Sequence, residues 1–300
     1  MHDRAVGLIG APTSAGAFAP GQEDAPAALR DAGFAARLRD AGFEVVDLGD
    51  TPRFRWRPDR RDPLAMNVDA VRTGALAVAD RVALALERDL FPLVVGGDCT
   101  VELGTVLGWQ RHRTATSLLY LDPHPDLNTP DTAPDGAFDW MGMAHMLGEP
   151  GARRELVDLG GRTPALSPED VLIFGYSPPR ATSAEHATIA RHGLRVIEQD
   201  AVDRDPGAAA ASALTWASER GGPFLLHLDV DSIDFADLPL AENTDRNVGL
   251  TFETVASALD TLMTGELGAV TITELNPHHG EPGGATLTRF IDRFVAAFAA

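Results

Sequence analysis

Short apolar runs alternate along the chain with longer alanine-rich stretches in which apolar residues recur at helical spacing. The runs are largely continuous rather than alternating, which is typical of strands covered on both faces. They comprise residues 5–9, 43–48, 93–95, 117–121, 171–174, 194–197, 224–228 and 269–272. Helices are predicted at residues 68–88, 101–111, 183–192, 207–219, 251–263 and 285–299. This alternation predicts an α/β three-layer sandwich, with a mostly parallel sheet of about eight strands flanked by helices.

Four longer segments are irregular and rich in proline, glycine, aspartate or threonine. They comprise residues 11–25, 49–63, 128–136 and 235–249. None has the low complexity of a linker, so we expect residues 1–300 to form a single domain. Three of the four follow a predicted strand or its polar extension. Because ligands of open parallel sheets bind beyond the carboxyl ends of the strands, we expect the chemistry to lie there.

Composition and charge narrow the classes of function. The formal net charge is −19, which argues against nucleic-acid binding, because that depends on basic patches that release counterions. The charge suits a protein that binds cations. No run approaches the roughly 18 apolar residues that a membrane span needs, so we expect a cytoplasmic protein without membrane contact. The single cysteine, Cys99, excludes an internal disulfide.

Acidic residues follow two of the predicted strands. The first strand runs into Asp122, His124 and Asp126, and the second runs into Asp229 and Asp231. Side chains two positions apart on an extended chain point the same way, so each set can converge on one point. A third strand leads into the turn Gly96-Gly97-Asp98-Cys99, whose glycines permit a close backbone approach.

Several carboxylates in one crevice require compensation, because they repel one another and cannot all stay ionised. Divalent cations supply that compensation. A set of oxygen ligands with one imidazole suits hard or borderline ions such as Mn²⁺. The pattern therefore predicts a metal site at one edge of the sheet.

Together the motifs resemble those of the ureohydrolases, the family of arginase and agmatinase. They are Gly96-Gly97-Asp98-Cys99, Asp122-x-His124-x-Asp126-Leu127-Asn128, Asp229-Val230-Asp231-x-x-Asp234 and Glu274-Leu275-Asn276-Pro277. The resemblance extends over most of the chain, in the family's order and approximate spacing. It implies an arginase-like fold and a binuclear manganese site whose hydroxide attacks a guanidinium carbon. It also implies a small guanidino substrate and a homo-oligomer, either a trimer or a hexamer.

The resemblance also implies roles for individual residues. One ion would be held by Cys99, Asp122, Asp126 and Asp229, and the other by Asp122, His124, Asp229 and Asp231. Asp126 would accept a hydrogen bond from the hydroxide. Glu274 would face the substrate guanidinium, and Asn128 would contact the far end of the substrate.

Three departures from the family pattern stand out. Cys99 occupies a position where most members have a histidine ligand; some members that act on hydroxylated guanidines also have cysteine there. The family's catalytic histidine falls on Asp139. His227 shares a face with Asp229, so we expect it to contact the site or to transfer protons; the alternative is an ordinary core histidine. The loop at Ala133 and Asp135 lacks the usual hydroxyl groups. Free arginine is therefore not the expected substrate.

The leading hypothesis is a metal-dependent amidinohydrolase that releases urea or hydroxyurea from a guanidino or amidino substrate. A second hypothesis is a catalytically silent relative with a structural or regulatory role, which a buried, inert Cys99 and the change at Asp139 would favour. A third is a deacetylase with a single zinc ion. The pair Asp229 and Asp231 speaks against the third, and metal content distinguishes all three.

Overall fold

The computed structural model describes residues 5–113, 115–133 and 135–300, so Pro134 of the predicted loop at 128–136 lies outside it. The described residues form eight strands: β1 (Val6–Gly10), β2 (Val45–Asp50), β3 (Phe91–Val95), β4 (Ser117–Leu121), β5 (Val171–Tyr176), β6 (Arg195–Glu198), β7 (Phe224–Asp229) and β8 (Leu267–Thr273). All pair in parallel, in the order β2-β1-β3-β8-β7-β4-β5-β6. The predicted fold class is therefore confirmed. That residues 1–300 form one domain stays a prediction.

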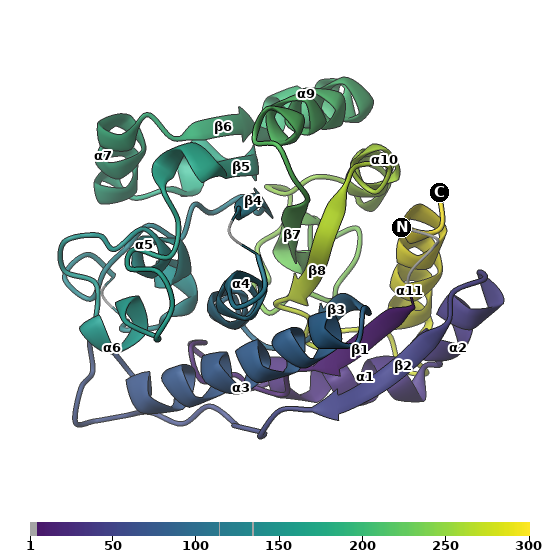
Figure 1. The fold of residues 1–300 in the computed structure, drawn as a ribbon, viewed down its shortest axis with the longest axis horizontal. Coiled ribbons are helices and arrows are strands. Elements are labelled where there is room, and N and C mark those ends of the chain that lie inside the picture. Colours follow the sequence, from purple (N-terminus) through teal and green to yellow (C-terminus); the bar gives the residue numbers. More distant parts are fainter. Residues whose placement is uncertain (1–4, 114, 134) are drawn as a thin grey trace.

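Helices cover both faces of this sheet (Figure 1). In chain order they are α1 (Ala25–Asp31), α2 (Phe34–Asp40), α3 (Val68–Glu87), α4 (Val101–Gln110), α5 (Gly142–Met146), α6 (Arg154–Val157), α7 (Ser183–His192), α8 (Gln199–Arg204), α9 (Pro206–Glu219), α10 (Phe252–Leu262) and α11 (Ala285–Phe298). The six predicted helices are all present. Thr251 caps α10 by accepting a hydrogen bond from the Thr254 N–H, and Gly193 ends α7 in the left-handed conformation.

Buried side chains form a core on each face of the sheet. One cluster packs α1, α2, α9, α10 and α11 against the strands, and the other packs α3, α4, α5 and α6 against the opposite face. Strand β4 contributes to both, because Leu119 and Leu121 point into the first cluster while Leu118 and Tyr120 point into the second. No helix among the described residues is long and apolar enough to cross a membrane.

The four central strands end at the same edge of the sheet. These strands are β3, β8, β7 and β4, which are consecutive neighbours. The chain continues from them into Gly96, Glu274, Val230 and Asp122 respectively. The topology therefore gathers the acidic motifs at one edge, as the sequence predicts.

Candidate metal centre and active site

Backbone turns at the strand ends bring the functional side chains close together. Gly96 and Gly97 have φ values of 87° and 89°, and a Cβ at Gly97 would lie 2.5 Å from the Val101 side chain and 2.9 Å from a backbone oxygen. Only glycine fits such a turn without strain. Asp126 and Glu274 also have positive φ, 51° and 60°. Such conformations are costly outside glycine and cluster at functional sites.

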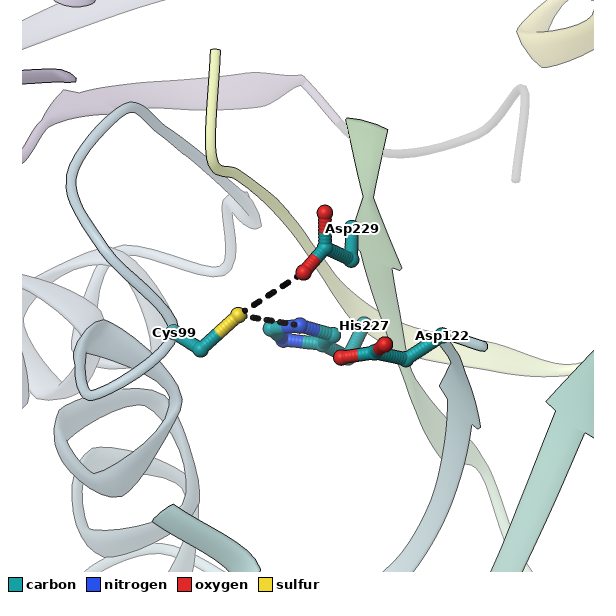
Figure 2. Close-up of side chains that lie close together, drawn as sticks. All are labelled: Cys99, Asp122, His227 and Asp229. Carbon is teal, nitrogen blue, oxygen red and sulfur yellow. Dashed lines mark hydrogen bonds between the residues drawn. The ribbon is translucent and has the colours of Figure 1, made fainter. Parts of the chain in front are cut away.

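A first group of potential ligands gathers four side chains around one point (Figure 2). Cys99, Asp122, His227 and Asp229 each offer an atom, and these atoms all lie within 4.8 Å of one another. The Cys99 Sγ donates to Asp229 Oδ2 at 3.1 Å and lies 3.6 Å from His227 Nε2. All four residues are buried. The group combines one sulfur, one nitrogen and two carboxylates.

A second group lies beside the first and shares Asp122 with it. Its other members are His124 and Asp231, and again the ligand atoms lie within 4.8 Å of one another. His124 Nδ1 is 3.3 Å from both Asp122 Oδ1 and Asp231 Oδ2. Adjacent groups that share a carboxylate have the arrangement that a pair of cations requires.

The electrostatics of the site penalise ionisation. Burial raises the pKa of Asp229 well above its usual range, and the charges of Asp231 and Asp122 raise it further. Burial likewise raises the pKa of the Cys99 thiol, helped by the charge of Asp229. For His124, burial alone would lower the pKa, but the charge of Asp231 raises it above the usual value. A positive charge placed among these groups would lower the pKa values of the acids and so favour their ionised forms.

Two buried carboxylate oxygens fit a cation directly. Asp122 Oδ2 and Asp231 Oδ1 have no hydrogen-bond partner among the described residues. A buried carboxylate oxygen without a partner costs free energy, which coordination of a cation would offset. The ligand types, the sharing of Asp122 and these two open oxygens therefore fit divalent ions.

Asp126 and Glu274 adjoin the ligand groups but already accept hydrogen bonds. The Tyr120 hydroxyl donates to Asp126 Oδ2 at 2.5 Å, and burial raises the pKa of Asp126 well above its usual range. The two Glu274 oxygens accept from the Cys99 N–H at 2.9 Å and from Gln22 Nε2 at 3.0 Å. Both carboxylates are thereby held in fixed positions.

A narrow cleft opens onto these residues. It is lined by Phe18, Cys99, His124, Asp126, Asp139, Trp140, Asp229, Asp231, Asn243 and Glu274. Asp139 is buried, and its Oδ1 accepts from the Trp140 N–H at 3.0 Å. Burial, with the charge of Glu274, raises the pKa of Asp139 well above its usual range. This environment favours the protonated form of the Asp139 carboxyl.

An outer hollow of about 250 Å³ shares His124 and Trp140 with the cleft. Asn128 lines it, and its Oδ1 accepts from the hydroxyls of Thr132 and Thr182, each at 3.0 Å. Arg180 lines it too, with the Arg180 side chain 11% exposed. A ligand in the cleft could therefore extend into a polar compartment.

The structure brings together most of the residues that the sequence singled out. Nine lie at the cleft or in a ligand group around it, namely Cys99, Asp122, His124, Asp126, Asp139, His227, Asp229, Asp231 and Glu274. Asn128 lies in the outer hollow, and His227 lies in the first ligand group. Their individual roles stay predictions.

Other residues of the site were missed. Tyr120 could have been found, because it is two positions before Asp122 and therefore on the same side of β4. Gln22, Trp140 and Arg180 belong to segments without a sequence signal that places them at the site. Their positions depend on how distant segments pack.

Comparisons with known proteins agree with this geometry. A sequence model described as the arginase family matches residues 4–295. Arginase from Bacillus subtilis is 30% identical over 294 residues, covering 97% of each chain. The crystal structure of that arginase superimposes with a TM-score of 0.85 over 99% of both chains, at 28% identity. The native arginase structure from Bacillus caldovelox gives a TM-score of 0.87 at 26% identity, covering 99% of this chain and 98% of the other. With this match over nearly its whole length, the chain belongs to the arginase family.

Proposed function

We propose that this protein uses two divalent cations, preferably manganese, to hydrolyse a carbon–nitrogen bond of a guanidino compound other than free arginine. The observation that carries the proposal is the pair of adjacent ligand groups that share Asp122. One ion would be held by Cys99, Asp122, Asp126 and Asp229, and the other by Asp122, His124, Asp229 and Asp231. Two ions bound there would lower the pKa of a water molecule and stabilise the charge that develops on the substrate.

The chain's own residues would bind and orient the guanidinium in the cleft. Glu274 is fixed by the Cys99 N–H and by Gln22, and its remaining lone pairs can accept charge-assisted hydrogen bonds from a guanidinium. The rings of Phe18 and Trp140 stack 6.4 Å apart and line the cleft, where they would limit the access of water. An acidic cleft selects a cationic group over an anionic one.

Two carboxyl groups are placed to handle protons. Water adds to the guanidinium carbon, a carbon–oxygen bond forms, and the bond from that carbon to the nitrogen of the substrate's tail breaks. Asp126, oriented by Tyr120, would accept a hydrogen bond from the attacking water. Asp139, whose pKa burial raises, would give its proton to the leaving nitrogen. The attacking water loses both of its protons: one leaves with the amine and the other restores Asp139, so the products are a urea and a protonated amine.

The outer hollow favours a substrate with an anionic end. The ion-pair distances from Arg180 to Asp231 and Asp245, 3.8 and 3.5 Å, are longer than hydrogen bonds, so its N–H groups can receive a carboxylate. The acids lining the hollow, Asp135 and Glu185, already accept hydrogen bonds from the chain. A substrate ammonium in this hollow would lie beside the cationic Arg180, which disfavours free arginine.

A substrate comparison tests the proposal. The Mn²⁺-loaded protein is supplied with arginine, with its desamino analogue, with a guanidino amine and with an N-hydroxylated guanidine, and the release of urea or hydroxyurea is measured. We expect a guanidino acid without the ammonium to be cleaved with a higher kcat/KM than arginine. Arg180→Met should raise KM for that acid by about 10- to 150-fold, because a hydrogen bond to a charged group contributes about 1.5–3 kcal/mol. Absence of turnover across the panel would instead support the catalytically silent alternative.

A further inference from the structure

We propose that His227 is itself a ligand of the first cation, binding through Nε2 together with Cys99, Asp122 and Asp229. This inference rests on the proposed function, because it concerns the same pair of ions. It departs from the ligand set that the family resemblance implies, in which position 227 plays no part.

The position of the imidazole carries the argument (Figure 2). His227 lies on β7, in register with Tyr120 of β4, and the two rings stack with their centroids 4.0 Å apart. Its Nε2 lies 3.6 Å from the Cys99 sulfur. Its ligand atom falls within 4.8 Å of the ligand atoms of Asp122 and Asp229 as well. The ring therefore adjoins the point at which the other three ligands converge.

A buried carboxylate holds this imidazole in the form that binds metals. His227 Nδ1 lies 3.2 Å from Glu102 Oε2, and both side chains are fully buried. Because a carboxylate accepts, the proton of the neutral ring belongs on Nδ1, which leaves Nε2 as an unprotonated acceptor. Histidine ligands of metals commonly donate their other N–H to a carboxylate in this way, which fixes the ring orientation and raises its basicity. The pairing also explains why α4 buries a glutamate at all.

The surroundings of His227 do not suit a proton relay to solvent. The side chain has no exposed surface, and it is absent from the described residues that line the cleft. Thr273 Oγ1 lies 3.1 Å from Nε2, so within the described part of the chain this nitrogen faces a hydroxyl, a thiol and carboxylates rather than a route to water. A ligand role uses this enclosure, whereas a shuttle role would require an opening.

The thiol at position 99 and the imidazole at position 227 complement one another sterically. The Cys99 sulfur is already 3.6 Å from His227 Nε2, so the larger imidazole at position 99 would crowd the His227 ring. In the family pattern an imidazole comes from position 99. This chain supplies it from the adjacent strand end instead, and a small side chain at 99 leaves room for it.

Equilibrium Mn²⁺ binding tests the inference. Metal-depleted parent protein, His227→Ala and His145→Ala are titrated with Mn²⁺, and free ion is followed by electron paramagnetic resonance. His145 is a matched control, because it is a buried histidine outside both ligand groups. We expect the parent and the control to bind two ions. His227→Ala should bind one of these ions more than about 100-fold more weakly, because even residues that only hold a ligand in place contribute about 10- to 100-fold to metal affinity. Added imidazole should restore the binding of that ion.

Glu102→Gln separates orientation of the ring from ligation. Because Glu102 only positions the ring, Glu102→Gln should weaken binding of the same ion by about 10- to 100-fold, less than His227→Ala does. A second measurement remains decisive if His227→Ala does not fold. In His124→Ala loaded with one Mn²⁺, pulsed resonance should still detect a directly bound imidazole nitrogen, which only His227 can supply within the two ligand groups.

The outcomes separate this inference from the proposed function. Two ions bound with parental affinity by His227→Ala, or the absence of a bound nitrogen in His124→Ala, would overturn the ligand role of His227 and leave the binuclear hydrolase intact. A parent protein that binds no Mn²⁺ would overturn both. Weaker Mn²⁺ binding by His227→Ala that added imidazole restores would support the inference.

Discussion

Asp229→Asn tests whether the two ion sites share a ligand. The substitution conserves shape, and the Asn oxygen can still accept the 2.6 Å hydrogen bond from the Asp231 N–H. It removes one of the negative charges that the site confines. Because burial and neighbouring acids raise the pKa of Asp229, the neutral amide should leave the metal-free protein at least as stable as the parent.

The expected rise in Tm follows from the linkage between metal binding and folding. Free Mn²⁺ at 100 times Kd raises the free energy of unfolding by about 2.7 kcal/mol per site, whereas a site that binds 100-fold more weakly raises it by only about 0.4 kcal/mol. For a chain of 300 residues, an unfolding entropy of about 2.1 cal/mol/K per residue converts 1 kcal/mol to about 1.6 °C in Tm. Two filled sites should therefore raise Tm by about 9 °C, and one site by about 4 °C.

Thermal unfolding with and without Mn²⁺ measures this shift. The parent should gain about 9 °C, Cys99→Ser, with one intact and one weakened site, about 5 °C, and Asp229→Asn only about 1 °C. Asp80→Asn is the matched control, because Asp80 is an exposed residue in a surface ion pair with Arg111. An Asp229→Asn protein that keeps the full metal-induced shift would refute the sharing of Asp229.

Three further predictions concern residues around the site. Asp139→Asn should lower kcat by about 10²- to 10⁴-fold with Mn²⁺ affinity unchanged, and parental kcat would exclude a proton-donor role. Glu274→Gln should raise KM for the guanidino substrate by about 10-fold or more, as steady-state kinetics would show; an unchanged KM would contradict its contact with the guanidinium. Burial lowers the pKa of His145 to about 4, below its unfolded value of 6.5, so stability should fall by about 3 kcal/mol as the pH drops from 6.5 to 4. Urea unfolding of His145→Gln should show a shallower loss over that range, and an equally steep loss would count against this cause.

The fold was largely predictable because buried parallel strands leave a strong local signal. Each apolar run, such as the one that became β4, is continuous and bounded by polar residues. The short helices α1 and α2 were not predicted. They are separated by Gly33 at φ 81°, and each is too short for a clear helical period.

Only part of the site could be predicted, by the rule that side chains two positions apart on a strand lie on the same side. That rule aligns Asp122, His124 and Asp126 on one strand extension, and it places His227 on the same side as Asp229. It says nothing about Glu102, which reaches His227 from α4 across 125 positions of sequence. It is equally silent about Arg180. Contacts between elements depend on packing, which no local pattern records.

The metal content of the active protein tests the central claim most directly. The protein is depleted of metal, reloaded with Mn²⁺, freed of excess ion and analysed for manganese per chain, while urea release is followed at each stage of loading. We predict two manganese ions per chain, with turnover that keeps rising until the second equivalent is bound. A chain that binds no metal, or one that retains a single zinc ion in preference to two manganese ions, would contradict the binuclear account.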